Sequence, residues 1–489
     1  MPRFDDDYPG LPIKLTPCSN GEFVAPPASD VVLETVRRAR EDAERTSRRL
    51  GLSRRRFLLS TMGSASTLAI LAACSKEADK VVGGGGPGGT YNVPATATTE
   101  ADSAFAALGG NEFVFDVQTH FLDSNHDIPD LGLSSAFPQQ SCGAEDPRDC
   151  FSVDKYLDLM FNKSDTNMLV ISALPFAGSP LNPEVMKRTI DLADRLGCQQ
   201  RVLMQGETHP SNGTVEKLLE NMATLNDTLP IGAWKTYCHL GGPGWYLDDH
   251  DKAAPQVGQK LLDQVRALGP KVLAVHKGFG NGSRFADPVD VGPAAKANPD
   301  ITFVVYHSGF DVNPQHKEVA YDEKNDKGVD RLITSCKKAG IGMGGNVVAE
   351  LGSTWRILMG NPDAAAHVLG KLLVHFGPDN IAWGTDSIWY GSPQDQIQAF
   401  RAFEITPRFQ EQFGYPQLTK EIKAKILGLN SARIYGVQPV TGICRFESEK
   451  IADTKLTSSD GNRTYGPRTP AQVQAVMDHE LAQLNYGLG

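Results

Sequence analysis

From residue 113 onward, short apolar runs rich in β-formers alternate with longer amphipathic segments of helical period. This alternation is typical of parallel βα units, in which each strand is followed by a helix that packs on the sheet. The pattern predicts eight strands, at Phe113–Asp116, Met168–Ser172, Arg201–Gln205, Ile231–Thr236, Val272–His276, Thr302–His307, Ile341–Gly344 and Ile381–Gly384. It predicts helices between them, among others at Asp154–Phe161, Glu184–Leu196, Val215–Thr224, Gly258–Leu268, Asp330–Lys338 and Ala364–Phe376. Residues 111–437 are therefore expected to form one (β/α)8 TIM barrel, an α/β fold, although a doubly wound open sheet has the same local pattern.

Polar side chains follow several of these strands at their carboxyl ends. The residues concerned are Gln118, His120, Lys235, His276, His307 and Asp386. In a closed barrel the carboxyl ends of all strands meet at one mouth, whereas an open sheet spreads them along an edge. A shared site for these residues therefore favours the barrel.

The residue types at the strand ends suit a bound divalent cation. Gln118 and His120 are two positions apart and face the same side of an extended strand. His276 and His307 end neighbouring strands, and Asp386 offers the anionic oxygen that a cation or a general base needs. The alternatives are a structural role for each histidine and a helix-capping role for Asp386.

This ordered set resembles the amidohydrolase superfamily, in particular its amidohydrolase-2 branch of metal-dependent hydrolases and of decarboxylases similar to aminocarboxymuconate-semialdehyde decarboxylase. Residues 422–436, which end in Asn430-Ser431-Ala432-Arg433-Ile434-Tyr435-Gly436, resemble the terminal helix of that family. The resemblance covers residues 111–437 and implies a TIM barrel with one catalytic site.

The resemblance also implies roles for the strand-end residues. Its metal ligands would be Gln118, His120, His276 and Asp386, holding a divalent ion, with zinc expected first and manganese or iron as alternatives. His307 would act as acid and base, Asp386 would also accept a proton, and Lys235 would be catalytic by pairing with a substrate carboxylate or with Asp386. Gln118 departs from the family, which has histidine or a carboxylate there, and a neutral amide is a weaker ligand.

Three functions remain open at this point. The first is hydrolysis of an amide, ester or lactone by water activated at the metal. The second is non-oxidative decarboxylation of an aromatic or enoic acid on the same scaffold. The third is a non-catalytic, ligand-binding lipoprotein with a degenerate metal site, which Gln118 suggests. A small molecule, aromatic or carboxylated, is the expected partner. Tyr237 and Trp389, together with His209 and His239, lie near the mouth and suit such a planar molecule, the alternative being that they only pack the loops.

The first 110 residues are interpreted as an export signal and a linker. Ser53-Arg54-Arg55-Arg56-Phe57-Leu58-Leu59 precedes an apolar stretch that ends in Leu71-Ala72-Ala73-Cys74. This resembles a twin-arginine signal followed by a lipoprotein processing box, in which Cys74 is lipidated. Residues 1–73 would then be an N-terminal extension and signal, residues 74–110 a flexible Gly-rich linker, and the mature protein lipid-anchored in the periplasm or at the cell surface. The alternative is a buried or amphipathic helix.

Composition limits the remaining classes. The 489-residue chain has 48 Lys+Arg against 58 Asp+Glu, a net charge of −10, which disfavours binding to nucleic acid. The apolar run from Phe57 to Ala73 is shorter than the roughly 20 residues of a membrane span.

Among the cysteines, Cys142 and Cys150 are close enough to form a disulfide, the alternative being two free thiols. Residues 438–489 form an extension with a predicted helix at Pro470–Asn485 and no assigned chemistry, and the oligomeric state is left open.

Overall fold

The structure is a computed structural model of the chain. It describes residues 10–450 apart from short gaps at 82, 124–141, 143–146, 175–178, 209–212, 241, 281, 313–316 and 448–449. The predicted helix at Pro470–Asn485 and His209 lie outside the described residues.

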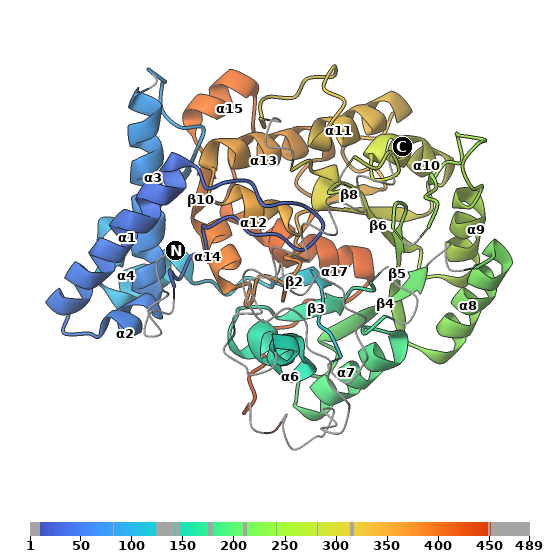
Figure 1. The fold of residues 1–489 in the computed structure, drawn as a ribbon, viewed down its shortest axis with the longest axis horizontal. Coiled ribbons are helices and arrows are strands. Elements are labelled where there is room, and N and C mark those ends of the chain that lie inside the picture. Colours follow the sequence, from blue (N-terminus) through green and yellow to red (C-terminus); the bar gives the residue numbers. More distant parts are fainter. Residues whose placement is uncertain are drawn as a thin grey trace.

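Eight parallel strands form the central sheet (Figure 1). In sheet order they are β2 (Phe115–Thr119), β3 (Met168–Ile171), β4 (Val202–Thr208), β5 (Ile231–Tyr237), β6 (Val272–His276), β7 (Thr302–Tyr306), β8 (Val347–Glu350) and β9 (Ile381–Ala382). The sheet closes because Thr119 bridges Ser387 in parallel and the Asp386 N–H donates to the Gln118 carbonyl. The predicted TIM barrel is thereby confirmed, and the open-sheet alternative is excluded.

Helices surround the barrel on its outer face (Figure 1). They are α6 (Val153–Leu157), α7 (Pro183–Arg195), α8 (Val215–Thr228), α9 (Gly258–Leu268), α10 (Val291–Ala297), α11 (Gly328–Ala339), α12 (Thr354–Leu358), α13 (Pro362–Phe376), α14 (Gln394–Ala402), α15 (Pro407–Phe413), α16 (Lys420–Ala424) and α17 (Asn430–Tyr435). Capping residues begin two of these helices. The side chains of Asn182 and Asn361 accept backbone N–H groups at the starts of α7 and α13, and a proline follows each asparagine.

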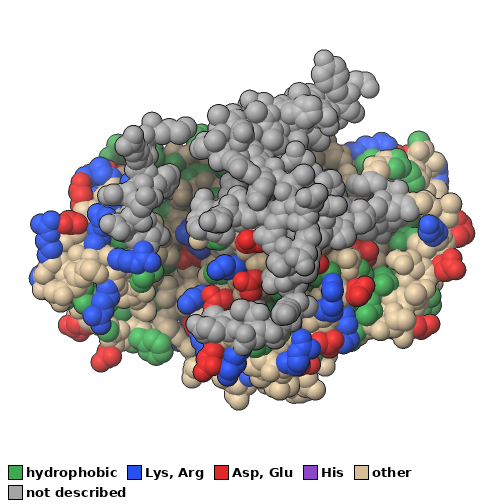
Figure 2. Space-filling view, turned by 60° about the horizontal axis from the view of Figure 1, so that its bottom comes forward, with side chains coloured by type: hydrophobic (Ala, Val, Ile, Leu, Met, Phe, Trp, Pro, Cys, Tyr) green, Lys and Arg blue, Asp and Glu red, His purple; other side chains and the backbone are tan. Residues whose placement is uncertain are grey.

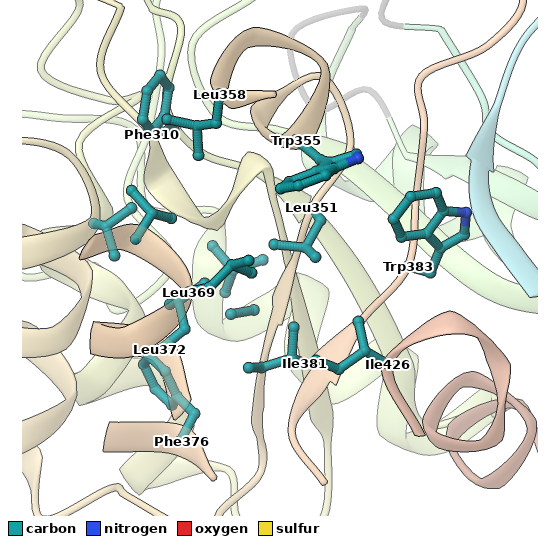
Figure 3. Close-up of a cluster of buried hydrophobic side chains, with 14 of the residues drawn as sticks. Phe310, Leu351, Trp355, Leu358, Leu369, Leu372, Phe376, Ile381, Trp383 and Ile426 are labelled. Atoms are coloured by element: carbon teal, nitrogen blue, oxygen red, sulfur yellow. The ribbon is translucent and has the colours of Figure 1, made fainter. Parts of the chain in front are cut away.

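Two apolar layers hold the barrel together. Inward-facing residues such as Val117, Ala274 and Val304 fill its interior. Residues on the opposite strand faces pack against the surrounding helices, and Figure 3 shows part of this outer layer, with Ile381 near Ile426 and Leu369 near Leu372. Both layers are buried, so the barrel is a packed support for its mouth and not a pore.

The predicted seventh strand is wrong in position. Residues 341–344 form a turn, and β8 begins at Val347. Gly340 and Gly344 adopt positive φ values of 80° and 73°, which continuous strand backbone does not. The other predicted strands overlap the observed ones.

The N-terminal residues form a helical unit beside the barrel, at the left of Figure 1. It comprises α1 (Asp30–Arg49), α2 (Arg54–Leu58), α3 (Thr61–Val81) and α4 (Ala101–Leu108), with α1 packed on α3. The stretch interpreted as the apolar centre of a signal, Phe57–Ala73, includes the end of α2 and more than half of α3. No helix in the described part of the chain is long and apolar enough to cross a membrane.

Cys74, the predicted lipidation site, lies on α3 and is buried. Its modification as a lipoprotein requires cleavage directly before it, which removes α1, α2 and most of α3. Export and lipidation stay predictions. The segment that they would remove or modify is folded against the barrel in this structure.

Residues 74–110 differ from the expected flexible linker. After α3, β1 (Gly89–Tyr91) pairs with β10 (Phe403–Ile405) in an antiparallel ribbon, and the turn η1 (Ala95–Thr98) leads into α4. Gly89 serves close packing here, because a Cβ at this position would overlap the Pro362 carbonyl and the Phe403 ring. Contacts at β1 thus hold this stretch against the barrel.

Two disulfides link parts of the chain. Cys142 and Cys150, for which the sequence left a disulfide and two free thiols open, form a disulfide. A second disulfide, Cys198–Cys444, joins the end of α7 to the segment after the barrel. Its partners are 246 residues apart, and the sequence carries no local signal for that pairing.

Charged side chains of both signs are interspersed over the described part of the face in Figure 2. On α1, for example, Glu34 pairs with Arg37 and Arg38, and Arg37 also pairs with Glu41. Water screens exposed pairs of this kind, so they matter more for solubility than for stability.

His367 on α13 is expected to make stability depend on pH. Its ring packs on Phe409, its Nδ1 lies 3.0 Å from the Tyr415 hydroxyl, and burial lowers its pKa to about 4. In the unfolded chain the pKa is about 6.5, so the unfolded state binds more protons between these values. The contribution of neutral His367 should be complete above pH 6.5 and should fall toward pH 4, by at most about 1.4 kcal/mol per pH unit.

The substitution His367→Gln should therefore make the free energy of unfolding less dependent on pH. Urea unfolding at pH values of about 5 and about 7.5 measures the difference. A variant with the wild-type dependence would show that His367 does not titrate in this way.

Candidate metal centre

The structure brings four predicted residues together at the carboxyl end of the barrel. His120, His276, His307 and Asp386 are all buried. His120 Nε2 lies 3.2 Å from Asp386 Oδ1, and the ring centroids of His276 and His307 are 4.6 Å apart. Gln118 joins the two pairs, because its Nε2 is 3.1 Å from Asp386 Oδ1 and 3.4 Å from His307 Nε2.

Strand register and backbone conformation place these side chains. His276 continues the inward-facing series of Val272 and Ala274 on β6, since alternate strand residues share a face. His307 and Asp386 instead follow the ends of β7 and β9, each with a φ of 60°. Such left-handed conformations are costly for residues other than glycine and cluster at functional sites.

Hydrogen bonds fix the tautomers of two histidines. His120 Nδ1 lies 2.9 Å from the Ser172 carbonyl oxygen, and His307 Nδ1 lies 2.7 Å from that of Gly352. A carbonyl only accepts, so each Nδ1 carries the proton and donates. Nε2 of each ring therefore faces the site.

This arrangement calls for a positive charge. The Nε2 lone pair of His120 and Asp386 Oδ1 face each other, so they need a shared proton or cation. Neither ring nitrogen of His276 has a hydrogen-bond partner in the described part of the chain. Two imidazoles and a carboxylate are a common ligand set for Zn²⁺, so these residues fit a divalent metal ion.

Asp386 remains ionised. Burial alone would raise the pKa of Asp386, but the hydrogen bond and positive charge of His120 in its protonated form hold that pKa below its ordinary value. Burial lowers the pKa of His307 to about 4, and the nearby Asp386 opposes this effect. Near neutral pH the site thus pairs an anionic carboxylate with a neutral imidazole.

Gln118 does not point its amide oxygen at the other ligands. Its amide nitrogen donates to Asp386, and its Oε1 has no hydrogen-bond partner in the described residues. Ligation by Gln118, as predicted from the resemblance, would require the amide to turn over. As placed, Gln118 orients Asp386.

Lys235 on β5 is fully buried inside the barrel. Its Nζ lies 3.3 Å from the centroid of the Tyr306 ring and 4.6 Å from that of Tyr237. No described residue forms a hydrogen bond with this nitrogen, and the expected pairing with Asp386 is not among the described ion pairs. Burial lowers the pKa of Lys235 to about 7, with Glu350 opposing that shift.

Glu350, at the end of β8, is a site residue that the sequence prediction missed. Its carboxylate accepts the His307 N–H at 3.0 Å and the Gly352 N–H at 2.6 Å. Burial raises the pKa of Glu350 to about 8. Because the seventh strand was predicted at the wrong residues, Glu350 was not recognised as a strand-end residue. Val347, Val348 and Ala349 do form an apolar run that ends on Glu350, which is the same pattern that marked the ends of other strands.

Ser353 and Asn20 were also missed. The Ser353 hydroxyl donates to Asp386 Oδ2 at 2.5 Å, and the Asn20 amide donates to the same oxygen at 2.8 Å. Asn20 belongs to the residues interpreted as a removable signal, so no strand-end pattern pointed to it.

Glu22 reaches the same place from the N-terminal segment. Its Oε1 lies 3.3 Å from His276 Nε2, and its Oε2 lies 4.0 Å from His307 Nε2. The ligand atoms of these three residues all lie within 4.8 Å of one another. Glu22 was not predicted as a site residue.

Aromatic rings line the site, as expected. Tyr237 stacks on His276 with 4.8 Å between ring centroids, and Trp389 stacks on His120 at 5.3 Å. His239 lies 5.0 Å from His276. These rings hold the imidazoles in place and offer flat apolar surface beside them.

The comparisons with known proteins give one family match. The family Amidohydro_2, described as amidohydrolase, matches residues 115–437, which is more than half of the chain. Among curated proteins, none matches the chain significantly.

Several solved structures are similar to the chain at low identity. An uncharacterized TIM-barrel protein of Bordetella bronchiseptica is 12% identical, over 66% of this chain and 98% of that chain, with a TM-score of 0.45. An amidohydrolase of Burkholderia multivorans with bound zinc is 13% identical, over 67% and 100%, with a TM-score of 0.42. The 5-carboxyvanillate decarboxylase of Sphingomonas paucimobilis is 13% identical, over 67% and 99%, with a TM-score of 0.38. Likenesses this low carry no argument about the reaction.

Proposed function

The chain belongs to the amidohydrolase family, and from this premise we propose that it is a metal-dependent hydrolase of an amide, ester or lactone. Two observations carry the proposal: His120 Nε2 faces Asp386 Oδ1 at 3.2 Å, and both ring nitrogens of the buried His276 lack a hydrogen-bond partner among the described residues. These three residues would hold the metal ion. When bound, a divalent cation supplies Lewis-acid chemistry, polarising a carbonyl group and making a water molecule more acidic.

His307 is proposed as the group that moves protons. Its Nε2 lone pair faces the site, and its Nδ1–H, held by the Gly352 carbonyl, fixes the ring. Nε2 can take a proton from water during attack and give it to the leaving group afterwards. Glu350 assists by holding the His307 backbone N–H.

Asp386 is proposed as the second proton acceptor. Its Oδ2 already accepts hydrogen bonds from Ser353 and Asn20, which fix the carboxylate and favour its charged form. A charged, oriented carboxylate next to an imidazole suits attack by water on a carbonyl carbon.

A second candidate function is non-oxidative decarboxylation, and Lys235 is the observation that favours it. Its buried Nζ lies over Tyr306 without a hydrogen-bond partner among the described residues, so a carboxylate entering the mouth would find a cation there. The aromatic surface of Tyr237 and Trp389 suits a planar acid.

Removing the metal is expected to abolish turnover. Purified full-length protein should contain a divalent ion, zinc, manganese or iron, and chelation followed by readdition should remove and restore activity. Screening esters, lactones, amides and aromatic acids while following acid and carbon dioxide separates the two reactions. A protein without metal that stays inactive after zinc or manganese is supplied would instead support the ligand-binding alternative.

A further inference from the structure

The residues before α1 reach the mouth of the barrel, where Asn20 contacts Asp386 and Glu22 contacts His276. In Figure 1 this dark blue stretch loops from the helical unit past α12 toward β8. Several contacts anchor it. Ile13 and Leu15 are buried, and the Phe23 ring packs on that of Phe279 at 5.0 Å between centroids. Lys14 Nζ donates to the Tyr390 carbonyl and pairs with the carboxylate of Asp395.

A tight turn at residues 19–23 directs two side chains into the site. The Ser19 hydroxyl accepts the Gly21 N–H, and Asn20 Oδ1 accepts the Glu22 N–H. Gly21 has a φ of 88°, a conformation that glycine adopts without cost. These bonds shape the turn from its own residues, so its side chains are held before any ligand arrives.

Asn20 and Glu22 form one hydrogen-bonded unit with Asp386. The Asn20 amide nitrogen donates to Glu22 Oε2 at 2.7 Å and to Asp386 Oδ2 at 2.8 Å. It therefore bridges the two carboxylates and leaves Oε1 of Glu22 facing His276 Nε2 at 3.3 Å. An amide that orients a carboxylate in this way is typical of the groups behind a metal ligand.

The first strand of the barrel offers a neutral side chain at the ligand position that the family resemblance implies. Gln118 stands there, and a neutral amide is a weaker ligand for a divalent cation than a carboxylate. Glu350 does not replace it, because both of its oxygens accept backbone N–H groups from His307 and Gly352. Glu22 brings a carboxylate to within 3.3 Å of His276 Nε2 and 4.0 Å of His307 Nε2.

We propose that Glu22 is a ligand of the metal ion, supplied from outside the barrel, and that it compensates for the missing charge at Gln118. Together with Asp386 it provides two negative charges, which balance a divalent cation in a buried site. The N-terminal segment is then part of the metal centre. This inference rests on the proposed function, because both require a bound divalent cation.

The test measures metal binding directly. Full-length protein, Glu22→Gln, and Glu22→Gln with Gln118→Glu are stripped of metal and titrated with Zn²⁺ or Mn²⁺ alone against a competing chelator. Glu22→Gln should weaken binding by about tenfold or more, and Gln118→Glu should restore most of that loss. The rise in Tm that the metal produces should shrink and recover in parallel, because a weaker ligand stabilises the fold less.

Glu41→Gln is the matched control, a carboxylate-to-amide change on exposed α1, and it should bind metal as the wild type does. Wild-type affinity in Glu22→Gln would overturn the ligand role. If Glu22→Gln binds the metal as the wild type does but has a lower KM for the substrate, the ligand role is also overturned. The N-terminal segment would then be a segment that blocks the mouth. Loss of binding without rescue by Gln118→Glu would overturn the compensation. If the wild type binds neither ion, the proposed function fails as well.

Discussion

Replacing Asp386 by asparagine is expected to lower kcat by about 10²–10⁴-fold while leaving the protein folded. The change removes the negative charge and one acceptor oxygen at the point where Asp386 faces His120, but it keeps the shape of the side chain. Bonds from Ser353 and Asn20 can still be accepted by the amide oxygen. Steady-state rates on the substrate found by screening, with the circular dichroism spectrum alongside, measure the effect.

Asp379→Asn is the control for this variant. Asp379 lies at the opposite end of β9, is 55% exposed and pairs with Lys425. It should retain the wild-type rate. An Asp386→Asn protein with a near-normal rate would remove Asp386 from the mechanism.

Breaking the buried ion pair behind His276 is expected to produce the largest loss of stability. Lys277 follows His276 directly, and its Nζ lies 2.8 Å from a carboxylate oxygen of Asp290, both side chains being fully buried. Asp290 also accepts the Leu247 N–H. Asp290→Ala leaves the Lys277 ammonium buried without its partner, which should lower the free energy of unfolding by about 3–5 kcal/mol.

Urea unfolding of the purified variants measures this loss. The double variant Lys277→Met with Asp290→Leu should be closer to the wild type, because it removes both charges and fills the space with apolar groups. A loss below about 1 kcal/mol in Asp290→Ala would show that the pair does not hold the strand end.

The placement of Glu22 bears on how the chain is processed. A cut directly before Cys74 would remove Asn20 and Glu22 together with the helices that hold them. Lipidation at Cys74 and a metal centre that contains Glu22 therefore cannot belong to the same mature chain. The mass of the protein isolated from its native cell distinguishes the two.

The strand ends of the barrel were predictable because local sequence carries their signal. β6 was predicted with its observed bounds, since Val272-Leu273-Ala274-Val275 is a continuous apolar run that ends on His276. β8 was predicted at the wrong residues because the glycine-rich turn before Val347 obscured where its apolar run begins. Glu350 was therefore not identified as the residue that ends this strand.

By itself, the sequence determined the order of strands and helices, the family, and the residues His120, His276, His307 and Asp386 at the strand ends. The order of elements and the strand-end positions follow from local periodicity and from the rule that parallel strands end at a common edge, and the family follows from the resemblance that these residues carry. Only the tertiary structure decided which groups face one another: the amide nitrogen of Gln118 on Asp386, the Nζ of Lys235 over Tyr306, and Glu22 beside His276. Such contacts join residues up to hundreds of positions apart, and their geometry depends on packing that no short stretch of sequence encodes.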